Sequence, residues 1–250
     1  MCSSRKNIKK FNIFSTFRII SKEHRLVAMK NITKYTPGFN IHDVQKKYHI
    51  KKVIKLASNE NPFISETVSK YISQKKHNMN LYPDSKPIYL QALIAKQLGC
   101  RLKENNIILG NGSNEILEFI TRLTLNETSE VIIPKHSFLV YQIISKLQNA
   151  KIIVSTPDRN KNSTNYLGVD LGSIKKKISK KTKLIFIANP ANPTGTYIKL
   201  SMIEEFIDSI PKNITVVIDE AYYEYLDSKV DKSAVSLITK YKNIIVTRSF

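Results

Sequence analysis

The chain has 250 residues, of which 42% are hydrophobic, so it is long enough to bury the core of one large domain. No apolar run reaches eighteen residues, which excludes a membrane-spanning helix of ordinary length. Two cysteines (Cys2 and Cys100) and five histidines show no disulfide or metal-binding spacing. The formal net charge is +20, but no nucleic-acid recognition motif accompanies it. We therefore expect a cytoplasmic protein that binds no metal, no membrane and no nucleic acid.

Much of the excess charge lies near the N-terminus, where residues 1–55 hold 14 Lys and Arg against two acidic residues. Residues 1–28 are basic, contain Ser and are nearly free of acids, which resembles a transit peptide. Alternatively, Met29 is the true start of the protein. Either interpretation predicts that residues 1–28 are not part of the fold.

Residues 29–80 predict an N-terminal arm with a helix over IHDVQKKY (41–48), a short strand over Val53–Leu56, a turn-rich SNENP loop and a helix over 65–74. A further helix is expected over Pro87–Leu98 and ends at Gly99. Its expected buried side consists of Ile88, Leu90, Leu93, Ile94 and Leu98.

The segment NNIILGNGSNEILEFITRL (105–123) predicts a strand at Ile107–Leu109, a glycine-rich turn and a helix that begins near Ser113. The apolar face of this helix is expected to comprise Ile116, Leu117, Ile120 and Leu123. Free amides at a helix N-terminus, approached through small residues, can bind an anion such as phosphate. The alternative is a hairpin, since Asn-Gly favours tight turns, but the residues that follow have a helical period.

From residue 131 onward, apolar strands alternate with helices, which predicts a mainly parallel α/β sheet covered by helices on both faces. The expected strands are 131–133, 152–154, 184–188, 215–218 and 243–247. We assign residues 81–250 to this large domain.

Two of the predicted strands end in distinctive polar segments. The first continues into NPANPTG (189–195), where two prolines and a glycine form a rigid turn around Asn192. The other ends in DEAYYEY, which places Asp219 at the carboxyl edge of the sheet. Asp219 could instead cap a following helix. A nucleotide hydrolase is excluded because its phosphate loop needs a Gly-Lys pair, which the chain lacks.

These motifs together resemble the cofactor-binding core of fold-type I aminotransferases, which use pyridoxal 5′-phosphate. Within that superfamily the chain is most similar to the histidinol-phosphate aminotransferases. The resemblance runs from Tyr35 to Phe250 and is more specific for the superfamily than for the substrate. It implies transamination between histidinol phosphate and 2-oxoglutarate in histidine biosynthesis.

The resemblance also implies a role for each matching residue. Asp219 corresponds to the acid beside the ring nitrogen, and Asn192 and Tyr222 to the partners of the ring hydroxyl. Phe138 corresponds to the aromatic residue on the ring face. Three residues correspond to the phosphate-binding turn: Gly112, Ser113 and Asn114.

Three further matches lie in the N-terminal part of the chain. Tyr82 corresponds to a tyrosine that reaches the cofactor phosphate of the neighbouring subunit, which implies a homodimer. Tyr35 and Asn59 correspond to positions that line the substrate pocket.

One departure from the family's pattern concerns the Schiff-base lysine, which we expect after Phe250, together with a small C-terminal domain. We therefore expect this chain to represent a truncated aminotransferase. The alternatives are an inactive remnant of the fold and, within the enzyme class, a threonine-phosphate decarboxylase-like enzyme or an aromatic aminotransferase.

Overall fold

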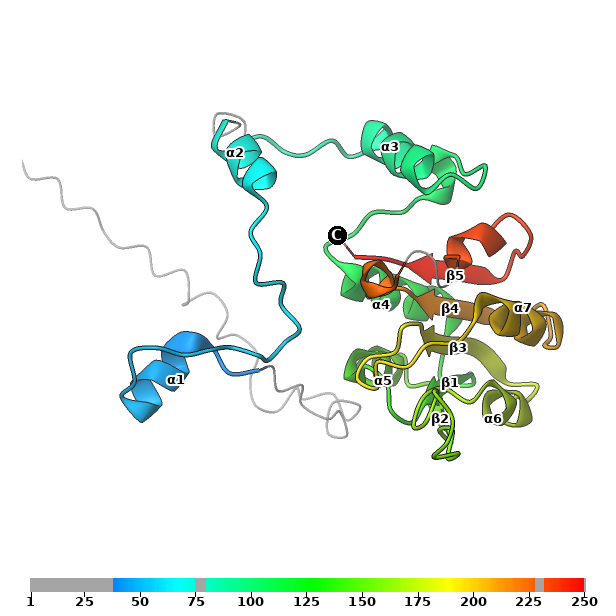
Figure 1. Ribbon diagram of the computed structural model, residues 1–250. Coiled ribbons are helices and arrows are strands. Elements are labelled where there is room, and N and C mark those ends of the chain that lie inside the picture. The colour runs from blue at the N-terminus through cyan, green and yellow to red at the C-terminus, as the bar shows by residue number, and fades with distance from the viewer. Residues whose placement is uncertain (1–37, 75–79, 228–231, 250) are drawn as a thin grey trace, which may run out of the picture. The chain divides into compact units, whose positions relative to one another are not determined.

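The computed structural model describes residues 38–74, 80–227 and 232–249 of the chain (Figure 1). The N-terminal extension at residues 1–28 and the predicted site residue Tyr35 lie outside the described residues. Among the helices that are described, none is long and apolar enough to cross a membrane. The same ranges contain no cluster of three His, Cys, Asp or Glu side chains that could hold a metal ion.

The fold is built on a five-stranded sheet with the strand order β2-β1-β3-β4-β5, and every pairing between these strands is parallel. This confirms the predicted fold class. The strands are β1 (Glu130–Pro134), β2 (Lys151–Ser155), β3 (Thr182–Ala188), β4 (Thr215–Asp219) and β5 (Ile244–Thr247).

Helices connect the strands, as a parallel sheet requires. Those of the sheet domain are α4 (Ser113–Thr124), α5 (Leu139–Leu147), α6 (Leu171–Lys176) and α7 (Leu200–Asp208). Before them come α1 (Ile41–Tyr48), α2 (Glu66–Gln74) and α3 (Ile88–Leu98). Three short 3₁₀ turns complete the described elements: η5 (Glu104–Asn106), η6 (Tyr223–Tyr225) and η7 (Ala234–Leu237).

One face of the sheet is covered by α4 and α5 and the other by α6 and α7 (Figure 1). Side chains alternate along a strand, so neighbouring residues of β3 enter different cores. Leu184 and Phe186 join the cluster under α4 and α5, whereas Ile185 and Ile187 join the cluster under α6 and α7. Because both faces are buried, a shift of one residue in register would exchange the contents of the two cores.

The order of the strands reverses direction between β1 and β3. After β1 the chain moves outward to β2, and it then returns past β1 to β3, β4 and β5. Ligands of such sheets bind beyond the carboxyl ends of the strands at the reversal point. Two predicted site segments flank this point, since Phe138 follows β1 and Asn192 follows β3. Asp219 ends β4, the next strand of the sheet.

Two predicted strands were wrong. Residues 53–56 and 107–109 pair with no other strand in the described part of the chain. Ile54 and Leu56 are 78% and 90% exposed, and Ile108 is 75% exposed. An apolar, β-branched run indicates an extended segment, but a strand also needs a partner that satisfies its backbone groups.

The predicted buried faces of two helices were also only partly right. In α3 the buried residue is Ala95, while Ile88, Leu90 and Leu93 are each about half exposed. In α4, Leu117 and Ile120 are buried as predicted, but Leu123 is exposed. Helical periodicity identifies an apolar face and does not say which part of that face a neighbour covers.

Candidate active site

The centre of the candidate site is the Asp219 carboxylate at the end of β4. Register pairs Asp219 with Ala188 of β3 on one side and with Thr247 of β5 on the other. All three are the last residues of their strands. The sequence-based prediction that Asp219 lies at the carboxyl edge of the sheet is therefore confirmed.

Three donors hold this carboxylate in a site where Asp219 is only 5% exposed. Oδ2 accepts a hydrogen bond from the Tyr141 hydroxyl at 2.5 Å. Oδ1 accepts from the Thr247 hydroxyl at 3.0 Å and from the Ala221 amide at 3.2 Å. Burial raises the pKa of Asp219 above its ordinary value, and the hydrogen bonds from Tyr141, Thr247 and Ala221 oppose this rise.

The structure does not support the simpler interpretation of Asp219 as a helix cap. The residues after β4 form a turn and the short 3₁₀ segment η6, and no α-helix begins there. The bond from the Ala221 amide therefore orders a turn, and the remaining donors have no capping role.

Tyr141 is a site residue that the sequence did not reveal. It is fully buried in α5, where its ring stacks on Phe186 with 4.5 Å between ring centroids. Phe138 meets the same ring edge-on at 5.9 Å. Burial and the neighbouring Asp219 charge raise the pKa of Tyr141 well above its usual value, so its hydroxyl remains a donor. The one sequence feature that could have indicated Tyr141 is its hydroxyl, a single polar group on the apolar face of a helix, three residues after Phe138.

The loop after β3 is closed by hydrogen bonds, as the two prolines and the glycine predicted. The buried Asn189 donates from Nδ2 to the Ile198 carbonyl at 2.9 Å and accepts from the Ile198 amide at 2.8 Å. Gly195 has a φ of 66°, and its amide donates to the Ala191 carbonyl at 2.7 Å. Both X-Pro bonds, before Pro190 and Pro193, are cis. Asn192 sits half-buried inside this braced loop.

The loop after β4 carries Tyr222, whose hydroxyl accepts a hydrogen bond from Asn59 Nδ2 at 3.0 Å. The structure therefore joins two predicted site residues that are far apart in the sequence. The next carboxylate, Glu220, is buried and accepts from the Ser233 hydroxyl at 2.6 Å and the Ala234 amide at 2.7 Å. Burial raises the pKa of Glu220.

Arg248 reinforces the same loop from the end of β5. Its guanidinium lies 3.6 Å from the Glu220 carboxylate and 4.5 Å from the centroid of the Tyr223 ring. It also forms an ion pair with Glu224. These contacts fix the backbone on both sides of Tyr222, which sequence reasoning did not anticipate.

The predicted phosphate turn leads into α4. Gly112 precedes the helix with a φ of 78°, a conformation that side chains rarely adopt, and a Cβ there would meet nothing within 4 Å. Ser113 and Asn114 begin the helix, where backbone amides lack intrahelical acceptors. The helix packs beside β3 and β5, the strands that flank β4. This turn thus combines free amides with open space next to a glycine.

The remaining predicted residues are placed as follows. Phe138 is half-buried immediately before α5. The Tyr82 side chain is fully exposed in the single chain.

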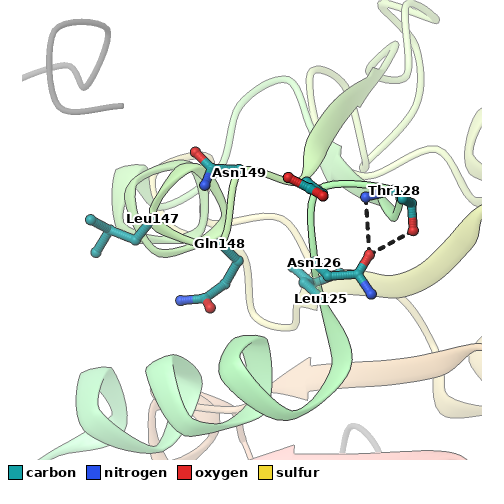
Figure 2. A pocket seen from close by; sticks show the side chains of 7 residues that line it. Leu125, Asn126, Thr128, Leu147, Gln148 and Asn149 are labelled. Carbon is teal, nitrogen blue, oxygen red and sulfur yellow. Dashed lines mark hydrogen bonds between the residues drawn. The ribbon is translucent and has the colours of Figure 1, made fainter. Parts of the chain in front are cut away.

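A hollow of about 410 Å³ lies away from these residues (Figure 2). It is lined by Leu125, Asn126, Glu127, Thr128, Leu147, Gln148 and Asn149. These residues precede β1 and β2, so the hollow lies at the amino ends of the strands, opposite the candidate site. The Asn126 side chain bonds there to the Thr128 amide at 3.0 Å and to its hydroxyl at 2.8 Å. The residues that line this hollow form no cluster of catalytic groups.

The donor set at the carboxyl edge fits pyridoxal 5′-phosphate. Among the described residues, Asp219 Oδ1 has two donors and Oδ2 has one, which leaves Oδ2 a lone pair for a protonated ring nitrogen. Asn192 and Tyr222 offer an amide and a phenol, and Phe138 offers an aromatic face. The turn at Gly112 offers amides for a phosphate.

Comparison with known proteins places the chain in a family. Residues 51–250 match the family model described as aminotransferase class I and II. The chain belongs to this family. It is 38% identical to histidinol-phosphate aminotransferase 2 of Haemophilus influenzae over 223 residues, which are 89% of this chain and 58% of that protein. Histidinol-phosphate aminotransferase 1 of Idiomarina loihiensis is also 38% identical, over 89% of this chain and 59% of that protein.

Solved structures of the family share the fold. Histidinol-phosphate aminotransferase from Sinorhizobium meliloti, in complex with pyridoxal-5′-phosphate, matches with a TM-score of 0.76 and 21% identity, covering 92% of this chain and 59% of that one. The Clostridium acetobutylicum enzyme matches with a TM-score of 0.62 and 27% identity, covering 77% and 54%. The chain thus spans less than two thirds of the length of these relatives.

Proposed function

We propose that this chain forms the cofactor-holding part of a pyridoxal 5′-phosphate-dependent aminotransferase. The observation that carries the proposal is the buried Asp219 carboxylate, which three donors fix at the carboxyl edge of an aminotransferase-family sheet. When bound, the cofactor supplies an electron sink for the substrate carbon that carries the amino group. The protein's task is to bind the cofactor and tune its electronics.

Each site residue has a distinct part in this proposal. Asp219 holds a proton on the ring nitrogen, because an anionic acceptor stabilises the protonated form. Asn192 and Tyr222 hydrogen-bond the ring hydroxyl, and the bond from Asn59 orients the Tyr222 hydroxyl. Phe138 covers one face of the ring.

The phosphate would be held at the start of α4. Its proposed ligands are the amides and side chains of Gly112, Ser113 and Asn114. The half-charge of the helix N-terminus favours an anion at this place. Asn59, together with Tyr35, would contact the substrate.

For substrates we propose histidinol phosphate as amino donor and 2-oxoglutarate as acceptor. The proposal is supported by the curated relatives, which are histidinol-phosphate aminotransferases, and by family membership over most of the chain. The test is to supply both compounds and the cofactor to the polypeptide encoded by the whole gene and to measure glutamate. Glutamate formation that requires histidinol phosphate would support the proposal. Release of carbon dioxide from threonine phosphate, or turnover of aromatic amino acids alone, would contradict it.

We also propose that the site is shared between two copies of the chain. The fully exposed Tyr82 side chain supports this together with the exposed Leu81 and Tyr89, because several large apolar side chains exposed in one segment indicate a surface that a partner covers. Tyr82→Phe and Asp219→Asn subunits, denatured together and refolded as a mixture, should then regain about a quarter of the sites in intact form. Each hybrid dimer would combine Tyr82 from one subunit with Asp219 from the other at one site.

The measurement is transaminase activity of the mixture against each variant alone. Each variant refolded with unaltered subunits is the control for recovery of activity after refolding, and co-purification through an affinity tag on one of the two variants demonstrates subunit exchange. Activity no higher than that of the better parent, with exchange demonstrated, would show that Tyr82 does not serve a neighbouring site.

A further inference from the structure

The carboxylate of Asp219 accepts a hydrogen bond from Tyr141, and both of these residues are buried. Tyr141 is fully buried and Asp219 is 5% exposed, and their side chains meet at 2.5 Å. A separation of this size is typical of a hydroxyl that donates to an ionised carboxylate. A phenylalanine would fill the same apolar space, so packing alone does not require the hydroxyl.

We propose that Tyr141 is a positioning residue that keeps Asp219 ionised and fixed in orientation toward the ring nitrogen of the cofactor. The inference rests on the function proposed above. Thr247 and Ala221 both donate to Oδ1, so among the described residues Tyr141 alone holds Oδ2. Without it, Oδ2 would lose its protein donor, and the buried carboxyl group would favour its protonated form.

Packing of the Tyr141 ring fixes the side chain, so its hydroxyl cannot turn toward another acceptor. The ring contacts two aromatic neighbours: it is stacked on Phe186, with 2° between the ring planes, and meets Phe138 edge-on at 89°. Phe138 lies immediately before α5 and Tyr141 in its first turn. The same helix start therefore carries the proposed cover of the cofactor ring and the partner of the acid.

The groups that face Asp219 come from three elements. Tyr141 comes from α5, Thr247 from β5, and the Ala221 amide from the turn after β4. Tyr222 is the other titratable group whose charge acts on Tyr141. Of these three donors, Tyr141 is the one that bonds Oδ2, so removing its hydroxyl leaves the two hydrogen bonds to Oδ1 in place.

The first test uses the protein without cofactor and compares Tyr141→Phe with Tyr241→Phe. Tyr241 is also buried and donates to a carboxylate, Asp208 Oδ2, at 2.8 Å, but Asp208 lies outside the site. Burial raises the folded-state pKa of Asp219, so its contribution to stability falls as pH rises through that pKa. Tyr141→Phe raises the pKa of Asp219 further. The melting temperature of this variant should therefore fall further below that of the unaltered protein at pH 8 than at pH 5.

The control behaves differently because the hydrogen bond from Tyr241 lowers the pKa of Asp208. Asp208 is then ionised in both states between pH 5 and pH 8, and Tyr241→Phe should lower the melting temperature equally at both. Equal losses at pH 5 and pH 8 for Tyr141→Phe would overturn the inference.

The second test measures equilibrium binding of pyridoxamine 5′-phosphate, which has no aldehyde to react with surface lysines. At neutral pH, Tyr141→Phe should bind it roughly 10-fold more weakly than the unaltered protein, and the acid limb of binding should move to higher pH. The 1-deaza analogue, which lacks the ring nitrogen, should bind both proteins alike. Tyr141→Phe placed in an Asp219→Asn background should have little further effect.

The outcomes separate the inference from the function on which it rests. If the unaltered protein binds the probe and Asp219→Asn weakens binding, but Tyr141→Phe matches Tyr241→Phe, the inference is overturned and the function stands. If the unaltered protein binds neither probe, or binds both without regard to Asp219, the proposed function fails and the inference fails with it. A selective, pH-dependent loss in Tyr141→Phe supports both.

Discussion

Asp219→Asn is expected to lower kcat for transamination roughly 100-fold or more, because it removes the fixed negative charge that faces the ring nitrogen. The fold should remain intact. The Tyr141 and Thr247 hydroxyls and the Ala221 amide can still donate to the amide oxygen or adapt to it. Burying a neutral amide also costs less than burying a carboxylate, so the variant should unfold at the same temperature or a higher one.

The measurement is kcat and thermal unfolding of the polypeptide from the whole gene, with Asp208→Asn as the matched control. Asp208 is another aspartate that accepts from a tyrosine, but its side chain is 55% exposed and lies outside the site. It should retain near-normal turnover. Near-normal turnover in Asp219→Asn, by contrast, would refute the role of Asp219 in catalysis.

Phe186→Ala is expected to destabilise the sheet domain by about 3–5 kcal/mol. Phe186 lies fully buried in β3, the central strand, and its ring stacks on Tyr141. Its removal would leave a cavity under α4 and α5 and release one side of the Tyr141 ring. Cofactor binding should therefore weaken as well, through the loss of order at Tyr141 and Asp219.

Denaturant unfolding measures this loss, and Phe63→Ala is the control. Phe63 is 83% exposed, so its truncation should change the free energy of unfolding by less than about 0.5 kcal/mol. A loss below about 1 kcal/mol in Phe186→Ala would mean that the stack does not stabilise the core. It would also remove the packing argument for a fixed Tyr141.

The sequence predicted the five strands of the sheet and the residues at their carboxyl ends. Each of these strands is an apolar run with polar, turn-forming residues at its ends, and this pattern can be recognised from the local sequence alone. Asp219 and the closed loop around Asn192 could be located for the same reason, since a strand end and two prolines are local features.

The parts that failed depend on contacts between distant segments. The bond between Tyr141 and Asp219 joins residues 78 positions apart, and nothing local marks either partner for the other. The same holds for Arg248 and Glu220. The exposed segment at Ile54 and Leu56 shows the converse, because its local pattern favours a strand but no described neighbour pairs with it.

A crystal structure of the protein with pyridoxamine 5′-phosphate tests the central claim most directly, which is that the carboxyl edge of this sheet holds the cofactor. We expect the ring nitrogen about 2.7–3.1 Å from Asp219 Oδ2. The ring hydroxyl should lie beside Asn192 and Tyr222, and the phosphate at the amides that begin α4. Binding at the hollow near Asn126, or at the carboxyl edge with the ring nitrogen turned away from Asp219, would contradict the account.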